Sequence, residues 1–467
     1  MQTKPKLKFV LSKIRTAYFC KSCGSRHSKW EGRCNSCSEW NTLEEEVIQK
    51  ETKSDVKSKS WKEPSKTENK PKRLAEVVIG ETQRIKFTDN ELNRVLGGGI
   101  VPGSLVLLGG QPGIGKSTLL LQICLSIKSS ILYVSGEESK EQIKMRANRI
   151  QEQNDNCLIY NETNIDTILK QAKQIVPSIL IIDSIQTLYS PHIESTAGTV
   201  SQVRECTSEL QKFAKSLNIP IFIIGHITKE GSLAGPKLLE HIVDVVLHFE
   251  GDKLYAYRIL RTIKNRFGST DEIGIYEMQS DGMREVENPS ELLLSQNEDN
   301  LSGIAVAASM EGMRPLLIEV QALVSPAIYG NPQRSSTGFD LRRLSMLLAV
   351  LEKRCGLAYG QHDVFLNLAG GLKITDPALD LAVVASLISS RQDISLSDEI
   401  AFIGEVGLSG EVRSVSRIEQ RLQEAARLGR SQIYISKYSL KGIDTTKYDA
   451  NIVGVSKVDD LLREVFA

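Results

Sequence analysis

The sequence predicts an α/β fold with a largely parallel sheet in a chain of several domains, and three observations carry this prediction. Residues 74–285 alternate short β-branched runs with helical stretches, as parallel strands and their crossover helices do. A glycine-rich segment, GGQPGIGKST at 109–118, directly follows the apolar run SLVLL. The chain has 467 residues, 41% of them hydrophobic, which is enough for two or three cores rather than one.

Four cysteines near the amino terminus are arranged as Cys20-x-x-Cys23 and Cys34-x-x-Cys37. Each pair offers two thiolates, and a tetrahedral zinc ion takes four, so residues 1–43 are predicted to form a zinc ribbon with an amino-terminal extension. The alternative is that the thiols are incidental or redox-active, although no βαβ unit adjoins them. The remaining cysteines are scattered and are expected to pack as small apolar side chains: Cys124, Cys157, Cys206 and Cys355.

Composition divides the rest of the chain. Residues 44–73 are rich in Lys, Glu, Ser and Thr and have almost nothing to bury, which predicts a flexible linker. Residues 74–290 are predicted to be a nucleotide-binding domain, and residues 291–467 a second unit that mixes strands and helices. The expected strands are SLVLLG, SILYVSG, SILIID, IPIFIIG and VDVVLHFE, and the clearest helices cover 118–127, 139–150, 200–217 and 339–354.

The net charge of +1 hides an asymmetry. Residues 1–73 contain eighteen Lys and Arg against nine Asp and Glu, so the amino-terminal arm is the segment expected to face a polyanion. No apolar run approaches the roughly 20 residues that span a bilayer, and the short FVL run is too brief for a secretory signal. A cytoplasmic location without membrane contact is expected, where the cysteines stay reduced.

The segment 109–118 matches the phosphate-binding pattern G-x-x-x-x-G-K-[ST]. Backbone N–H groups of such a loop surround phosphate oxygens, the lysine reaches the β- and γ-phosphates, and the serine hydroxyl binds magnesium at a helix start. ATP with Mg²⁺ is therefore the expected ligand. The residues expected to contact it are Gly110, Gln111, Pro112, Gly113, Ile114, Gly115, Lys116, Ser117 and Thr118.

Acidic residues follow two of the predicted strands. Asp183 ends SILIID, where a carboxylate can act on the magnesium ion, although it could instead cap the next helix. Glu137 follows ILYVSG and is the predicted catalytic base that deprotonates the attacking water. The alternative is that Glu137 and Glu138 are first-turn helix residues favoured by the helix dipole, a role preferred for Glu138. His226 ends IPIFIIGH and could sense the γ-phosphate or be structural.

Several blocks together resemble the RadA (Sms) family of bacterial recombination proteins, within the RecA-like ATPase superfamily. These blocks are GGGIVPGSLVLLGGQPGIGKST, YVSGEES, LIIDSIQ, GHITKEGSLAGPKLLEHIVD and KNRFG, and the resemblance covers nearly the whole chain. It implies that Lys116 and Ser117 act at the phosphates and magnesium, that Asp183 is the acidic strand residue and that Glu137 is the base. In KNRFG, Lys264 and Arg266 match the basic pair that reaches the neighbouring subunit's nucleotide. The alternative is a solvated basic turn.

Residues from about 301 onward resemble the proteolytic domain of Lon, through the blocks GFDLRRLSMLLAVLEKR, VFLNLAGGLKITDPALDLAVVASLISS and FIGEVGLSGEVRSVSRIEQRLQEAARLG. The resemblance implies a Lon-protease-like α+β domain. Ala378 stands where Lon has its nucleophilic serine, and Glu419 aligns with the catalytic lysine. An alanine has no nucleophile and a glutamate is no neutral amine, so no peptidase activity is expected.

The resemblance implies an ATP-dependent DNA repair and recombination factor, active in DNA damage and stress responses. It would form a homo-oligomeric ring, expected to be hexameric, bind single-stranded and branched DNA, promote branch migration with helicase-like activity, and meet a RecA-type recombinase. Two other classes stay open: an ATP-dependent Lon-like protease, and a signalling or scaffold ATPase indifferent to DNA. Candidate DNA-binding residues, each of which could equally be a surface charge, are Lys229, Lys237, Arg314, Arg334, Arg342 and Arg343.

Overall fold

The computed structural model describes residues 15–20, 25–48, 84–150, 154–225, 236–251, 257–294, 301–327, 330–371 and 373–466. The chain divides into two compact units, and each is described by itself. Unit 1 comprises residues 1–250, 258–270 and 276–285, and unit 2 comprises 251–257, 271–275 and 286–467. The last change of unit, at residue 286, lies close to the boundary predicted between 290 and 291.

The amino-terminal part of unit 1 is a small antiparallel sheet of β1 (Arg15–Cys20), β2 (Arg26–His27) and β3 (Leu43–Ile48), in the order β2-β1-β3. Strand β3 pairs with β1 along its whole length, from Leu43 opposite Cys20 to Ile48 opposite Arg15. The sheet therefore extends five residues into the segment predicted to be linker. Its acidic run EEE gives no apolar signal, because the pairing is made by backbone groups.

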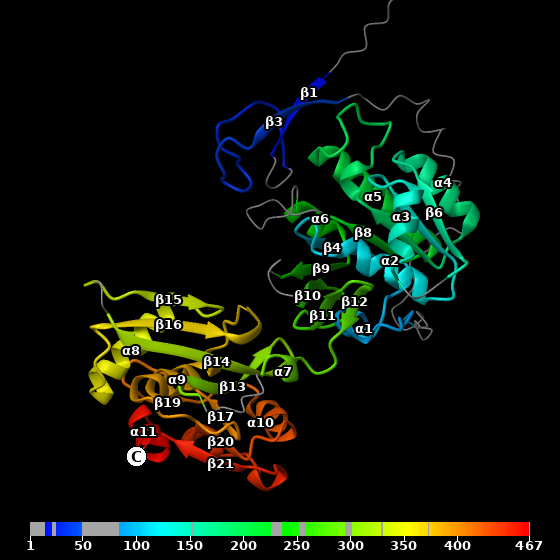
Figure 1. Ribbon diagram of the computed structural model, residues 1–467. Coiled ribbons are helices and arrows are strands. Elements are labelled where there is room, and N and C mark those ends of the chain that lie inside the picture. The colour runs from blue at the N-terminus through cyan, green and yellow to red at the C-terminus, as the bar shows by residue number, and fades with distance from the viewer. Residues whose placement is uncertain are drawn as a thin grey trace, which may run out of the picture. The chain divides into compact units, whose positions relative to one another are not determined.

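The core of unit 1 is a nine-stranded sheet (Figure 1), whose strands from β9 to β6 run parallel while β10 and β12 pair antiparallel with β9 and β11. In spatial order the strands are β12 (Gly282–Glu285), β11 (Ile273–Gln279), β10 (Tyr257–Asn265), β9 (Val245–Glu250), β4 (Leu105–Gly110), β8 (Ile221–Ile224), β7 (Ile179–Asp183), β5 (Ile131–Ser135) and β6 (Cys157–Asn161). The five predicted strands are confirmed as β4, β5, β7, β8 and β9.

Helices cover both faces of this sheet. They are α1 (Asn90–Val95), α2 (Lys116–Ser126), α3 (Lys140–Ala147), α4 (Ile165–Ile175), the short 3₁₀ helix η3 (Ile185–Thr187), α5 (Val200–Leu217) and α6 (Pro236–Ile242). Alternate residues of β4 enter two different apolar clusters: Val106 packs with residues of α2, and Leu107 packs with residues of α4 and α5. The strand is thus buried on both faces, which explains its continuous apolar sequence.

Unit 2 is built on a seven-stranded sheet of β15 (Arg334–Thr337), β16 (His362–Leu368), β14 (Arg314–Pro326), β13 (Ile304–Glu311), β17 (Ile400–Ile403), β20 (Gln432–Ser436) and β21 (Asn451–Val455), in that order. A separate ladder joins β18 (Glu405–Val406) to β19 (Val412–Arg413). The helices are α7 (Pro289–Leu292), α8 (Leu341–Cys355), α9 (Asp380–Gln392), α10 (Ile418–Arg427) and α11 (Val458–Phe466), with 3₁₀ turns η4 (Ala369–Gly371), η5 (Pro377–Leu379), η6 (Lys437–Leu440) and η7 (Thr445–Lys447).

The helix predicted over 339–354 is confirmed as α8, and Asp340 caps its amino terminus by accepting from the backbone N–H of Arg343. Helix α9 is buried continuously from Asp380 to Ser389, so it forms the centre of unit 2. Among the residues that the structure describes, no helix is long and apolar enough to cross a bilayer.

Candidate functional site

The phosphate-binding loop leaves β4 and enters α2 through three glycines with positive φ: Gly110 at +151°, Gly113 at +77° and Gly115 at +113°. A Cβ atom at Gly115 would lie 1.9 Å from Cε of Met283, and one at Gly110 would lie 2.9 Å from Cβ of Phe249. At Gly113 nothing lies within 4 Å of the added atom. The loop backbone is therefore packed against the protein at both ends and open in the middle, as phosphate binding requires.

Lys116 begins α2 and is buried, with its ammonium donating to the carbonyl oxygens of Gly110 at 2.7 Å and Gln111 at 2.9 Å. Burial lowers the pKa of Lys116 to about 8, against the opposing effect of the Asp183 and Glu137 carboxylates. The two carboxylates thus lie close enough to act on the ammonium. Three predicted residues from three different elements are brought to the carboxyl edge of the parallel sheet.

The other loop residues occupy the places that the motif requires. Ser117 and Thr118 are half-buried in the first turn of α2, and Ile114 is buried in the apolar cluster with residues of α2, which anchors the loop. Gln111 and Pro112 are exposed. Ser117 is therefore positioned at the helix start, where a hydroxyl can meet a phosphate-bound magnesium ion.

Asp183 ends β7 and is buried, and its Oδ2 accepts a hydrogen bond of 2.6 Å from the hydroxyl of Tyr133. Tyr133, on β5, was not predicted as a site residue. Burial and the Asp183 carboxylate hold the pKa of Tyr133 well above its usual value, so it stays a donor. The alternative of a helix cap is wrong, because the residue at the amino terminus of η3 is Ser184.

The alternative that both glutamates lie in a first helical turn is also wrong. Helix α3 starts at Lys140, and Ser139 caps it in a reciprocal pair with Gln142. Both glutamates precede that cap. Glu138 is ion-paired with Arg146 from the last turn of α3, and its backbone N–H donates to the hydroxyl of Ser135 at 3.0 Å.

Glu137 is exposed, and its Oε1 accepts a hydrogen bond from the hydroxyl of the fully buried Ser184. Glu137 also lines an open pocket of about 380 Å³ at the carboxyl ends of β5 and β6. The residues around this pocket are Ser135, Gly136, Glu137, Glu138, Ser139, Asn161, Glu162 and Thr163. Glu137 thus acts electrostatically on Lys116, whereas Glu138 is ion-paired with Arg146.

The KNRFG segment starts on β10 and ends in the following turn. The ammonium of Lys264 donates to the carbonyl oxygens of Glu240 and of Val243, the latter at 2.8 Å. Arg266 lies 3.6 Å from the buried carboxylate of Asp244 and leaves 49% of its side chain exposed. An anion of the same unit thus lies beside the basic pair, and of the two cations Arg266 is the more exposed.

Arg84 fixes the turn that carries this segment, and sequence reasoning missed it. Its guanidinium donates to the carbonyl oxygens of Phe267 at 2.6 Å, Leu96 at 2.9 Å and Gly99 at 3.2 Å. A single arginine outside any motif carries no signal in one sequence, so only the fold reveals this contact.

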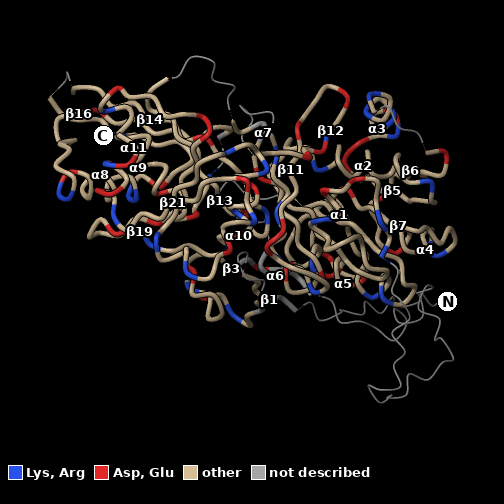
Figure 2. Tube along the Cα trace, turned by 90° about the horizontal axis from the view of Figure 1, so that it is seen from below, with Lys and Arg blue, Asp and Glu red and all other residues tan. Residues whose placement is uncertain are grey.

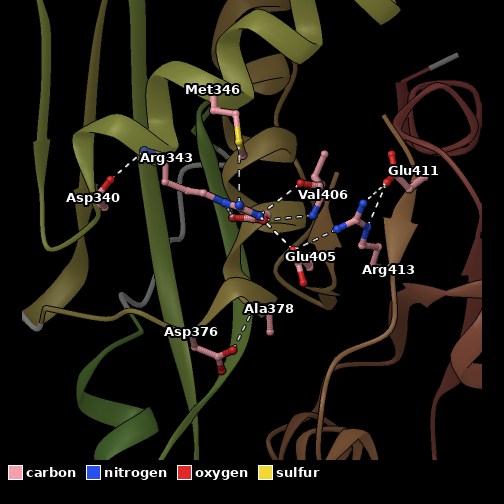
Figure 3. A network of polar contacts seen from close by, with 10 residues as sticks. Asp340, Arg343, Met346, Asp376, Ala378, Glu405, Val406, Glu411 and Arg413 are labelled. Atoms are coloured by element: carbon pink, nitrogen blue, oxygen red, sulfur yellow. Dashed lines mark hydrogen bonds and ion pairs between the residues drawn. The ribbon is translucent and has the colours of Figure 1, made fainter. Parts of the chain in front are cut away.

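The Lon-like features lie in unit 2. Ala378, in η5, is completely buried in an apolar cluster with Leu422 and Ala425 of α10, whereas Glu419 is exposed at the start of that helix. The backbone N–H of Ala378 donates to Asp376, as Figure 3 shows. The place of a nucleophile is therefore filled by apolar packing, and no dyad is assembled there.

The four candidate arginines of unit 2 differ in their surroundings. Arg343 contacts Asp380, Glu405 and the carbonyl oxygen of Val406, in the network drawn in Figure 3. Arg314 is 8% exposed and donates to two backbone carbonyls. Arg334 and Arg342 are exposed.

Three further candidates lie wholly or partly outside the described residues. His226 and Lys229 lie outside the described residues, and so does the side chain of Lys237, which is the second residue of α6. Along the described trace of each unit, positive and negative residues are interspersed (Figure 2).

The amino-terminal cysteines form a candidate metal centre. The Sγ atoms of Cys20, Cys34 and Cys37 lie within 4.8 Å of one another, and those of Cys20 and Cys37 are 3.6 Å apart. Tetrahedral zinc with Zn–S bonds near 2.3 Å places its sulfurs about 3.8 Å apart, so the spacing fits. Cys23 lies outside the described residues. Although burial opposes it, hydrogen bonds from Ser25 and the backbone lower the pKa of Cys34 to about 5, which favours the ligating thiolate.

Three family models match separate parts of the chain. Residues 68–232 match the AAA domain family, residues 327–439 match the family of subunit ChlI of Mg-chelatase, and residues 18–45 match the rubredoxin metal binding domain. A KaiC-like protein from Pyrococcus horikoshii is a weak structural likeness, with 19% identity and a TM-score of 0.38 over 44% of this chain and 99% of that chain.

Curated relatives match over nearly the full length. The DNA repair protein RadA of Streptococcus pyogenes serotype M6 is 49% identical over 98% of this chain and 100% of its own. That of Bacillus subtilis strain 168 is 49% identical over 97% and 99%. That of Streptococcus pneumoniae strain R6 is 53% identical over 85% and 95%.

Proposed function

The chain belongs to the RadA family of DNA repair proteins, and from this premise we propose that it is an ATPase stimulated by single-stranded and branched DNA. The free energy released by ATP hydrolysis would drive branch migration of recombination intermediates. The observation that carries the proposal is the meeting of Lys116, Asp183 and Glu137 at one sheet edge. A carboxylate, an ammonium and a glycine loop in that arrangement suit hydrolysis of a nucleoside triphosphate.

In this proposal the chain's residues divide the work. Lys116 leaves the loop carbonyls for the β- and γ-phosphates, and Glu137 accepts the proton of the water that attacks the γ-phosphorus. The bond from that phosphorus to the bridging oxygen breaks, and ADP and phosphate leave. Ser117 and Asp183 would hold Mg²⁺, which neutralises phosphate charge.

The basic pair acts between subunits of a ring, expected to be hexameric. Arg266 is the stronger candidate for reaching a neighbour's γ-phosphate, because half of its side chain is exposed and its contact with Asp244 is long. Lys264 first has to leave two carbonyl oxygens. Cations that stabilise transition-state charge in trans raise rates by about 10³-fold or more.

DNA binding would rest on phosphate contacts and weaken steeply with salt. Arg334 and Arg342 are the candidates in unit 2 that remain exposed. Lys229 and Lys237 are further candidates in unit 1. The same proposal includes a RecA-type recombinase as partner, a zinc ion in the ribbon and a cytoplasmic location. Ala378 gives no support to the protease alternative.

The test compares Glu137→Gln with the matched control Glu138→Gln. Hydrolysis of ATP in the presence of single-stranded DNA should fall by about 10²-fold or more in Glu137→Gln, the usual contribution of a general base. Nucleotide binding should persist in both variants. If Glu137→Gln hydrolysed ATP at the normal rate and Glu138→Gln did not, Glu138 would be the base instead of Glu137.

A further inference from the structure

Ser184 links the predicted catalytic base to the strand that carries Asp183. It directly follows Asp183, is fully buried, and donates its hydroxyl hydrogen to Oε1 of Glu137. This bond occupies Oε1 and holds the carboxylate of Glu137 against the residue that follows β7. Ser184 is therefore placed to control whether Oε1 of Glu137 is available to a water molecule.

A second contact joins the same two segments. Thr187, at the end of η3, donates from Oγ1 to the carbonyl oxygen of Ser184 at 2.8 Å. A Cβ atom on Gly136 would lie only 2.1 Å from that same Oγ1, so Thr187 packs directly against the residue before Glu137. Movement of residues 184–187 thus has to move or release Glu137.

Beyond η3 the chain becomes the loop 190–199, and one side chain anchors it. Gln202, on α5, is 1% exposed, and its Oε1 accepts from the backbone N–H of Ser190 at 2.8 Å. Its Nε2 donates to the carbonyl oxygens of Ile193 at 2.9 Å and Ser195 at 2.8 Å. The loop is therefore a defined structure, connected to Ser184 through the five residues 185–189.

We propose that Ser184 is a positioning residue that couples the loop 190–199 to Glu137. Without DNA the Ser184 hydroxyl holds Oε1 of Glu137, and on DNA binding a shift of the loop withdraws this hydroxyl, so that Oε1 can accept from water. This inference rests on the proposed function, because it takes Glu137 as the base and DNA as the activator. Beyond the proposed function, it adds Ser184 to the residues that govern hydrolysis and states that the loop 190–199 controls Glu137.

The experiment measures kcat and KM for ATP with and without single-stranded DNA. Ser184→Ala should raise the DNA-free kcat by roughly threefold to tenfold, the rate equivalent of one hydrogen bond, and bring the ratio of stimulated to basal kcat close to one. KM should stay within about twofold, since no phosphate contact changes. Ser184→Thr, which keeps the hydroxyl, should restore stimulation.

Ser104→Ala is the matched control, because Ser104 is also buried and donates only to the local carbonyl oxygen of Val101. Its stimulation ratio should equal that of the wild type. Ser184→Cys keeps the size with a weaker donor and should change the ratio in the same direction; it serves if Ser184→Ala does not fold.

Two outcomes would overturn the coupling role of Ser184. The first leaves the proposed function intact, and the second also overturns the assignment of Glu137 as the base. If Glu137→Gln is inactive while Ser184→Ala keeps the wild-type ratio, or loses basal and stimulated rates equally, the coupling role fails and the proposed function stands. If Glu137→Gln hydrolyses ATP at the wild-type rate, the base assignment fails and the coupling role fails with it.

Discussion

Arg421 and Asp376 form a buried ion pair in unit 2, with Nη1 of the arginine 2.6 Å from Oδ2 of the aspartate. The same guanidinium donates to the carbonyl oxygens of Ala308 and Ser416, and Asp376 also accepts from the backbone N–H of Met310. The pair ties α10 to the turn that contains Ala378. A segment that would hold a nucleophile in a peptidase is thus fixed by structural contacts.

The first prediction concerns this ion pair. Asp376→Ala should lower the free energy of unfolding of unit 2 by about 3–5 kcal/mol, because it leaves the buried Arg421 charge uncompensated. Arg463→Ala, which breaks a pair with Asp459 between exposed side chains, is the control and should cost no more than about 1 kcal/mol. Urea unfolding followed by circular dichroism measures both, and equal effects would contradict the structural role.

The second prediction is that restoring a serine does not restore a peptidase. Ala378→Ser places a hydroxyl among Leu422 and Ala425 without a base, and Glu419→Lys adds an amine on the exposed side of α10. The double variant should leave casein intact with ATP over hours. ATP-dependent release of casein peptides would revive the protease alternative.

The third prediction concerns pH. Phosphates bind the protonated form of Lys116, whose pKa is lowered to about 8, so affinity should be nearly flat below pH 8. Above it, Kd for a non-hydrolysable ATP analogue should rise by up to about tenfold per pH unit. Asp183→Asn removes a charge that raises this pKa, so the break should move to lower pH. A Kd that stays flat to pH 10 would exclude Lys116 as the titrating contact.

The fourth prediction is that Cys34→Ser releases a bound metal ion. Cys34 shares its site with Cys20 and Cys37, and losing one thiolate from a four-ligand zinc site removes most of its affinity. Metal analysis should find about one zinc per chain in the native protein and almost none in the variant. Cys206→Ser is the control, because Cys206 lies in the core of unit 1, and this variant should keep the zinc of the amino-terminal site. Native protein without zinc would contradict the prediction of a zinc ribbon.

The fifth prediction tests action between subunits. Arg266→Ala should cut hydrolysis by about 10³-fold and leave nucleotide binding intact. Mixed with Lys116→Ala, it should regain activity at boundaries where an intact phosphate loop meets an intact arginine. Absence of recovery after verified subunit exchange would assign Arg266 a role within its own subunit.

The central sheet could be predicted because its strands are buried on both faces. Leu105 to Leu108 enter clusters on opposite sides, so the sequence is a continuous apolar run that ends at the phosphate loop. Strands β10 to β12 were not singled out, since they are partly exposed and antiparallel. The start of the linker was placed too early because Glu44 to Glu46 pair through their backbone.

Site residues with a motif could be predicted, whereas those defined by contact could not. Asp183 follows four apolar residues, but Tyr133 lies inside another apolar run and contacts it only in the folded sheet. On α10, Glu419 and Arg421 are two residues apart and so point about 200° apart around the helix. That rotation exposes the first and buries the second, which no single sequence reveals.

The steady-state rate of ATP hydrolysis, measured with and without single-stranded DNA, decides whether the chain is a DNA-dependent ATPase. The sample is the wild-type chain, its oligomeric mass measured in the same buffer with and without ADP, and Lys116→Ala provides the background. We expect a several-fold rise in kcat when DNA is added, and we expect this rise to be lost as the salt concentration is raised. A rate well above the Lys116→Ala background that is the same with and without DNA would contradict it and favour a signalling or scaffold ATPase.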